Sequence, residues 1–149
     1  MTDIKDFEPD ESELHATTGE MVGLAIPMRQ GLALHFESTF LYRSAIHVYA
    51  SMEGPEPAIL SKVEFTLAEA NLPSGTYTLP SDKIKNVLYA IWWRGDGASK
   101  TYYAKSGQFV LINRWSELYL AGNFKFETDA VDNTAYSVTI NKFELRGDY

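Results

Sequence analysis

The chain has no cysteine among its 149 residues, which excludes disulfides, thiol nucleophiles and thiolate metal ligands. It also has no apolar run of about eighteen residues, the length that a membrane-spanning helix needs. The N-terminus is acidic and lacks the basic and apolar regions of a classical signal peptide. We expect a cytoplasmic protein if Met1 is the natural start, and a surface or secreted one if a leader has been removed.

Positive charge is also scarce, since the formal net charge is −7 at pH 7. Seven acids and one lysine fall in the first twenty residues, so this segment carries −6 and the remaining 129 residues carry about −1. A body so close to neutral has no basic field to hold phosphates, and we expect no nucleic-acid partner. We interpret residues 1–18 as an acidic flexible arm that adds little stability, and residues 19–149 as one domain.

Alternating apolar and polar residues take the place of helical periodicity through most of the chain. Runs rich in β-branched and aromatic residues end at glycine, asparagine or aspartate, as strands end at turns. These runs lie at residues 21–26, 32–36, 40–49, 59–67, 74–80, 87–93, 108–112, 117–120 and 135–145. The run at 87–93 is apolar on both parities, which is typical of a central strand or of one whose outer face is covered.

Two irregularities are predicted near the C-terminus. The last run changes phase, and a bulge at Asn141-Lys142 would restore a single buried face. Gly122, between Leu120 and Phe124, is predicted to mark a second bulge.

About nine strands with short connections predict an all-β, antiparallel domain. A β-sandwich is favoured over the alternative, a closed small β-barrel, because the glycine kinks that a small barrel needs are few. Aromatic residues make up 13% of the chain, and a core of this size needs no disulfides.

The C-terminal half contains four runs in a recurring order, at residues 74–79, 102–111, 120–126 and 138–145. This order resembles that of small uncharacterised bacterial all-β domains, some of them carried on surface lipoproteins. The resemblance covers residues 74–146. It implies an all-β fold and brings no active-site residue with it.

The nearest approach to a catalytic or metal-binding cluster is a set of polar residues on one parity of two neighbouring runs. These residues are His35, Glu37, Arg43 and His47. An ordinary solvent-facing surface is the favoured interpretation, because Leu41 and Tyr49 interleave on the same parity. We therefore predict no catalytic residue, no metal ligand and no cofactor, and keep an enzyme or metal site on the His35/His47 face as the alternative.

A second candidate site combines aromatic rings with hydrogen-bonding side chains. Rings stack on sugar faces or sit at lipid interfaces, and the polar groups hydrogen-bond to hydroxyls. The predicted ligand-binding residues are Trp92, Trp93, Arg94, Asp96, Tyr102, Asn113 and Trp115. Trp92 and Trp93 point to opposite faces of one strand, so at least one of them belongs to the core.

Two short motifs are more simply explained as turns. The tripeptide Arg-Gly-Asp, which integrins recognise, occurs at 94–96 and again at 146–148, but glycine beside aspartate is ordinary turn chemistry. The segment 129–133 has too few carboxylates for a dedicated calcium site, and we expect a hairpin loop there.

The sequence thus predicts a non-catalytic binding module that recognises a glycan, a lipid headgroup or a partner protein through exposed aromatics. The third alternative is a structural subunit that pairs strand edges into a homodimer, because the apolar run at 87–93 needs cover on both sides.

Overall fold

The computed structural model describes residues 15–28, 33–38, 40–53 and 59–147. These ranges form ten strands and one short 3-10 helix. Within them, no helix is long and apolar enough to cross a membrane. The elements are β1 (His15–Pro27), β2 (Leu34–Ser38), β3 (Phe40–Arg43), β4 (His47–Glu53), β5 (Ile59–Leu67), β6 (Gly75–Leu79), β7 (Ile84–Trp93), β8 (Ser99–Arg114), η2 (Trp115–Glu117), β9 (Tyr119–Thr128) and β10 (Tyr136–Arg146).

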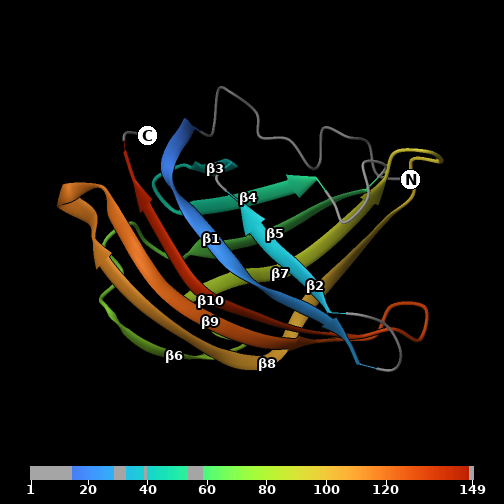
Figure 1. Cartoon of the computed structure of the whole chain (residues 1–149). Coiled ribbons are helices and arrows are strands. Elements are labelled where there is room, and N and C mark those ends of the chain that lie inside the picture. The colour runs from blue at the N-terminus through green and yellow to red at the C-terminus, as the bar shows by residue number, and fades with distance from the viewer. Residues whose placement is uncertain (1–14, 29–32, 39, 54–58, 148–149) are drawn as a thin grey trace.

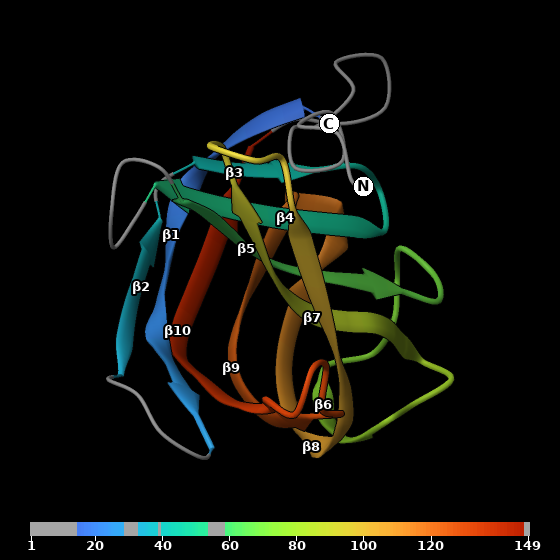
Figure 2. The same cartoon turned by 90° about the vertical axis from the view of Figure 1, so that its right-hand side faces the viewer.

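The strands form one antiparallel sheet in the order β10-β9-β8-β7-β5-β4-β3-β1-β2, and β6 pairs with β8. Because β1 also pairs with β10, the sheet curls nearly closed into a barrel with an open seam (Figures 1 and 2). The predicted all-β, antiparallel fold is confirmed.

The two longest strands turn the corners of this barrel by changing partners along their length. In β1, residues 15–17 pair with β3 and residues 18–27 pair with β10. In β8, residues 99–103 pair with β7, whereas residues 104–114 pair with β9. The molecule is therefore a flattened barrel whose two halves face each other like the sheets of a sandwich, joined at β1 and β8.

Aromatic rings fill the space between the two halves. Phe109 stacks on Phe124 with ring centroids 4.6 Å apart, and Phe65 meets Phe109 edge-on at 4.9 Å. Phe143 closes this group at 5.4 Å from Phe65. Such offset and edge-on pairs add stability beyond simple burial, so these rings anchor both halves of the barrel.

The predicted strand over residues 40–49 is wrong in one respect, because a turn divides it. The Ser44 hydroxyl oxygen accepts a hydrogen bond from the His47 N–H at 3.0 Å, and β3 ends before this turn. The turn shifts the alternation, so that Arg43 and Val48 both point inward and are buried. The parity of Arg43 predicted that it would share a face with His47. This prediction is wrong.

The C-terminal strands contain one of the two predicted bulges. The register between β9 and β10 shifts between Ile140 and Phe143, which confirms the bulge at Asn141-Lys142. Gly122 pairs with Leu111 without a shift, and on its other side it flanks the β9–β10 irregularity, whose extra residue lies on β10. The second bulge, predicted on β9 at this glycine, is therefore wrong. A Cβ there would lie 1.9 Å from the carbonyl oxygen of Val110, so the close approach of β8 requires glycine.

Strand β1 begins at His15, within the segment that the sequence assigned to the arm. Residues 15–17 pair with β3, and residue 18 already pairs with Arg146 of β10. The part of the predicted arm that lies outside the described residues is therefore 1–14.

Candidate functional site

Three of the predicted ligand-binding residues lie at the turn between β7 and β8. Arg94 and Asp96 are exposed, and the Asp96 carboxylate accepts a hydrogen bond from the Ala98 N–H at 2.9 Å, as expected for a turn. Trp93 packs against the main core, with the Lys100 ammonium 5.9 Å from its ring.

Three others are held inside the molecule. Tyr102 is buried beside Tyr136, with ring centroids 4.8 Å apart. Trp92 is also buried, in a small cluster separate from the main core. The Asn113 amide donates hydrogen bonds to the carbonyl oxygens of Ala70 and Leu72, which ties the segment before β6 to β8.

Trp115 is the one tryptophan among the described residues with a largely exposed side chain, at 50%. It lies in η2, the turn between β8 and β9, at the opposite end of β8 from Arg94 and Asp96. The predicted residues therefore do not form one site: some lie at one end of β8, some at the other end, and some are buried. Residues close in sequence to aromatic residues were grouped together, but the length of β8 separates them in space.

The two histidines of the alternative site are not brought together. Strand β2 approaches β4 through Ser38, whose hydroxyl donates to the Ser51 carbonyl at 2.5 Å, and His35 lies further back along β2. His47, at the other end of β4, contacts Glu64 instead. Among the described residues, no group of three or more histidine, aspartate or glutamate side chains could hold a metal ion.

A different set of polar residues meets at the β8–β9 turn. Tyr119, the first residue of β9, pairs with Arg114 of β8 on one side and with Arg146 of β10 on the other. Directly paired residues place their side chains on the same face of a sheet. We call Arg114, Glu117, Tyr119 and Arg146 the arginine–tyrosine surface.

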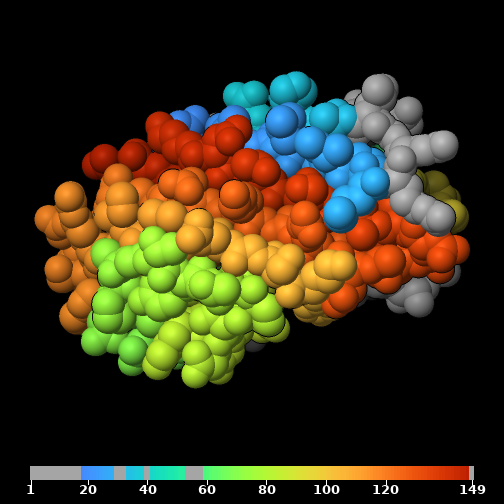
Figure 3. All heavy atoms as spheres, turned by 90° about the horizontal axis from the view of Figure 1, so that it is seen from below, coloured from blue at the N-terminus to red at the C-terminus, as the bar shows by residue number. Residues whose placement is uncertain are grey.

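The two arginines of this surface lie against one aromatic ring. Their guanidinium carbons are 5.5 Å (Arg114) and 4.9 Å (Arg146) from the Tyr119 ring centroid, within the range of cation–π attraction. The four residues line an open hollow of about 290 Å³. Figure 3 shows the outer surface of this half of the barrel, where β8 and β9 (orange) lie between the green segment with β6 and the red β10.

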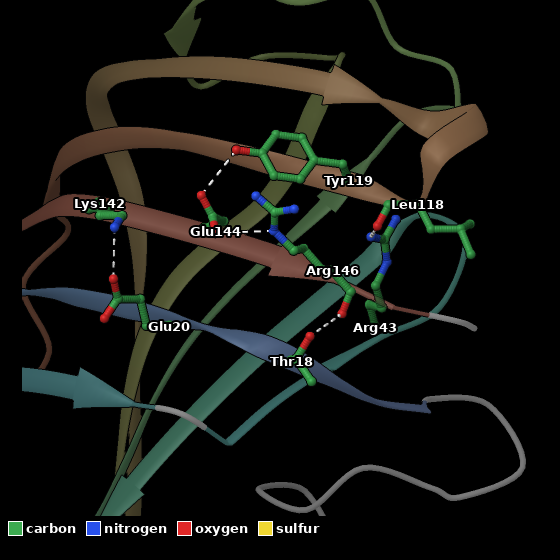
Figure 4. A network of polar contacts seen from close by, with 8 residues as sticks. All are labelled: Thr18, Glu20, Arg43, Leu118, Tyr119, Lys142, Glu144 and Arg146. Carbon is green, nitrogen blue, oxygen red and sulfur yellow. Dashed lines mark hydrogen bonds and ion pairs between the residues drawn. The ribbon is translucent and has the colours of Figure 1, made fainter.

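Glu144 fixes two of these side chains (Figure 4). Its carboxylate accepts a hydrogen bond from the Tyr119 hydroxyl at 3.1 Å and another from the Arg146 Nε at 3.3 Å. These hydrogen bonds from Tyr119 and Arg146 lower the pKa of Glu144 from its ordinary value. The carboxylate therefore stays ionised at neutral pH and holds the Tyr119 ring and Arg146 in place.

A buried arginine supports the same turn from inside the barrel. Arg43 donates a hydrogen bond from Nη1 to the carbonyl oxygen of Leu118 at 3.0 Å (Figure 4). Leu118 has a φ of 55°, a left-handed conformation that costs free energy for a residue with a side chain. The Thr18 hydroxyl donates to the Arg146 carbonyl at 3.0 Å, so β1 holds the β10 side of the surface.

This arrangement suits the recognition of anions attached to a flat molecule. A guanidinium offers paired N–H donors that match carboxylate, sulfate or phosphate oxygens. Trp115, in the same turn, has an exposed ring that offers an apolar face on which a sugar ring stacks.

The arginine–tyrosine surface escaped the sequence analysis because its residues are paired across strands. A hairpin centred on residues 115–118 would have placed Arg114 opposite Tyr119. In the sequence, Arg146 stands out only as the first residue of the second Arg-Gly-Asp tripeptide. Its position beside Tyr119 depends on the bulge at Asn141-Lys142, which shifts the register of β10 by one residue.

Comparisons with family models, with curated proteins and with solved structures find no match to this chain. The resemblance to bacterial all-β domains therefore stays an expectation.

Proposed function

We propose that this protein is a non-catalytic binding module that recognises an acidic glycan through the arginine–tyrosine surface. The observation that carries the proposal is the position of Tyr119 between Arg114 and Arg146, with both guanidiniums within 5.5 Å of its ring. The exposed Trp115 ring provides a stacking face, and the arginines pair with uronate or sulfate groups.

Glycans are favoured over the other predicted ligands by the shape of the surface. The hollow is open, and its polar groups stand beside an aromatic ring. A lipid surface would need several apolar side chains that enter the bilayer, whereas the lining of the hollow is two arginines, a glutamate and a tyrosine.

The proposal is tested by calorimetric titration of a sulfated and a uronate-containing oligosaccharide into the purified protein. We expect Arg114→Met and Arg146→Met each to weaken binding about tenfold or more, since a charged hydrogen bond contributes about 1.5–3 kcal/mol. Lys125→Met, an exposed cation elsewhere on the outer face of β9, is the matched control and should leave affinity nearly unchanged.

A charge change of opposite sign sharpens the test. Glu117→Gln removes a carboxylate from the hollow, so it should tighten the binding of an anion and make that binding more sensitive to salt. Either arginine variant should make the binding less sensitive to salt. No binding of either oligosaccharide, or equal loss in Lys125→Met and Arg114→Met, would contradict the proposal. Binding of phosphatidylserine vesicles alone would assign the surface to lipid headgroups instead.

A further inference from the structure

An apolar hollow lies where β7 and β8 separate. The ladder between these two strands ends at the pair Leu88–Tyr103, and β8 then pairs with β6 on that side, from Gly107 onward. Within residues 59–147, the ladder partners of the first residues of β7, 84–87, are therefore in β5 alone. The separation leaves a hollow of about 270 Å³, which is lined by residues 79–81, by residues 84–87 of β7 and by residues 103–104 of β8.

The inner surface of this hollow is apolar. Leu79, Ile84 and Val87 line it, and all three belong to the main core. Tyr103 lies at its rim, with 53% of the residue exposed. The lining is mainly apolar, whereas the hollow at the arginine–tyrosine surface is mainly polar. A ligand of the β7–β8 hollow therefore needs an apolar body.

Two polar side chains lie at the rim because β7 contains an extra residue there. The register between β5 and β7 shifts between Glu64 and Thr66, and Asn86 has a left-handed φ of 52°. Lys85 and Asn86 are both exposed, although successive residues of a regular strand point to opposite faces. Since both residues line the hollow, an ammonium and an amide are available to a ligand inside it.

The rim is also positively charged, in a chain whose net charge is −7. Residues 79–87 and 103–106 contain three lysines, Lys83, Lys85 and Lys105, and one acid, Asp82. In the part of the chain that the structure describes, no carboxylate forms an ion pair with these lysines. Glu127 of β9 lies across β8 from the hollow. Such a rim attracts an anionic group.

We propose that the hollow binds a small amphipathic carboxylate of the fatty-acid type. Its apolar chain contacts Leu79, Ile84 and Val87, and its carboxylate accepts hydrogen bonds from the Lys85 ammonium and the Asn86 amide. The volume of about 270 Å³ is close to the lower limit of ligand pockets, about 300 Å³, which favours a small molecule over a polymer.

This site is separate from the arginine–tyrosine surface. The two share β8, but Arg114 lies ten residues beyond Ala104 along the strand. Binding of a fatty acid therefore does not depend on the proposed binding of a glycan, and each is tested by itself.

Titration of sodium octanoate into the full chain, labelled with ¹³C at its methyl groups, tests the proposal by NMR spectroscopy. We expect shift changes and intermolecular NOEs at the methyl groups of Leu79, Ile84 and Val87. Ile112, which is 43% exposed elsewhere on β8, is the internal control and should show neither. Octanamide has the same chain without the charge and should bind about tenfold more weakly, since a hydrogen bond to a charged group is stronger than one to a neutral group.

Two variants test the role of the ammonium. Lys85→Met keeps the apolar stem of an exposed side chain and should weaken octanoate binding about tenfold, with an unchanged circular dichroism spectrum. Lys125→Met, an exposed cation on β9, is the matched control and should leave the affinity unchanged. The proposal is overturned if the three core methyl groups do not respond to octanoate, if octanamide binds equally well, or if both variants bind octanoate equally.

Discussion

Arg43 is the largest fully buried side chain of the described residues, and it shows how one residue supports a distant surface. It extends from β3 through the interior to the β8–β9 turn, where it donates to the Leu118 carbonyl. Burial of a charge costs free energy unless hydrogen bonds satisfy it. The hydrogen bond to Leu118 therefore stabilises both the buried guanidinium and the β8–β9 turn.

Arg43→Met tests this role. The substitution keeps an apolar stem and removes the donor to Leu118, so we expect the free energy of unfolding to fall by about 2–4 kcal/mol. Urea denaturation followed by circular dichroism measures the change. Arg114→Met, at a side chain 65% exposed, removes the same charge and should change stability by less than about 0.5 kcal/mol. Equal effects of the two substitutions would show that the buried position is unimportant.

Tyr89 predicts how the fold responds to alkaline pH. Burial raises the pKa of the Tyr89 phenol above its ordinary value of 10.0, with the neighbouring Tyr136 and Tyr102 adding to the effect. The unfolded chain therefore releases this proton near pH 10 while the folded chain keeps it. The free energy of unfolding should be constant below that pH and should fall as the pH rises above it.

The measurement is the midpoint of alkaline unfolding, followed by circular dichroism together with tyrosinate absorbance. Tyr89→Phe has no proton to lose and should move the midpoint to higher pH, although its stability at pH 7 falls by about 1 kcal/mol with the loss of the hydrogen bond to Ser61. Tyr103→Phe, at an exposed side chain, should leave the midpoint in place. A midpoint that moves equally in both variants would contradict the assignment to Tyr89.

At the scale of elements, the close approach of β8, β9 and β10 depends on Gly122. It has a φ of 147°, and an added Cβ would meet the Val110 carbonyl at 1.9 Å and the Phe143 ring at 3.2 Å. Backbone atoms cannot move aside as a flexible side chain can, so the strands would have to separate.

We therefore expect Gly122→Ala to lower the free energy of unfolding by more than about 2 kcal/mol, measured by thermal or urea denaturation. Gly95→Ala is the matched control, because nothing lies within 4 Å of its added Cβ and no left-handed φ is required there. A change of less than about 0.5 kcal/mol in Gly122→Ala would show that β9 adjusts without strain.

At the scale of the whole molecule, the composition of the acidic segment predicts how much stability it adds. Residues 1–14 hold six acids and one lysine, with few large apolar residues. We therefore expect that removal of this segment shifts the melting temperature by no more than about a degree or two.

Differential scanning calorimetry of the full chain and of the chain from His15 onward tests this expectation. A fall in the melting temperature of about 5 °C or more on removal of the segment would contradict it.

The edges of β7 bear on assembly at the same scale. Over residues 88–92 both are paired, one with β5 and the other with β8, so this part of the strand has no edge to offer a second copy. Its apolar character on two faces reflects the main core on one side and a small buried cluster on the other, formed by Leu60, Leu88, Ala90 and Trp92. A homodimer stays a prediction that does not depend on this strand.

Features that depend only on residues close together in the chain could be predicted from the sequence alone. The alternation of apolar and polar residues predicted the antiparallel strands, the two apolar faces of residues 87–93 and the bulge at Asn141-Lys142. Each of these features depends on a short run of side chains. The turn at Asp96 could be predicted from its glycines, because turn chemistry is also local.

The closure of the strands into a barrel, and the residues that this closure brings together, depend on contacts between distant segments and could not be predicted from the sequence. The near-closure depends on β1 changing partners after Thr17 and on β8 changing partners after Tyr103, and no local pattern records such a change. The inward direction of Arg43 depends on one turn at Ser44, since a shift of one residue moves every following side chain to the other face. Tyr119 lies between Arg114 and Arg146 because two independent registers coincide at one position, and register is a property of strand pairs rather than of a single strand.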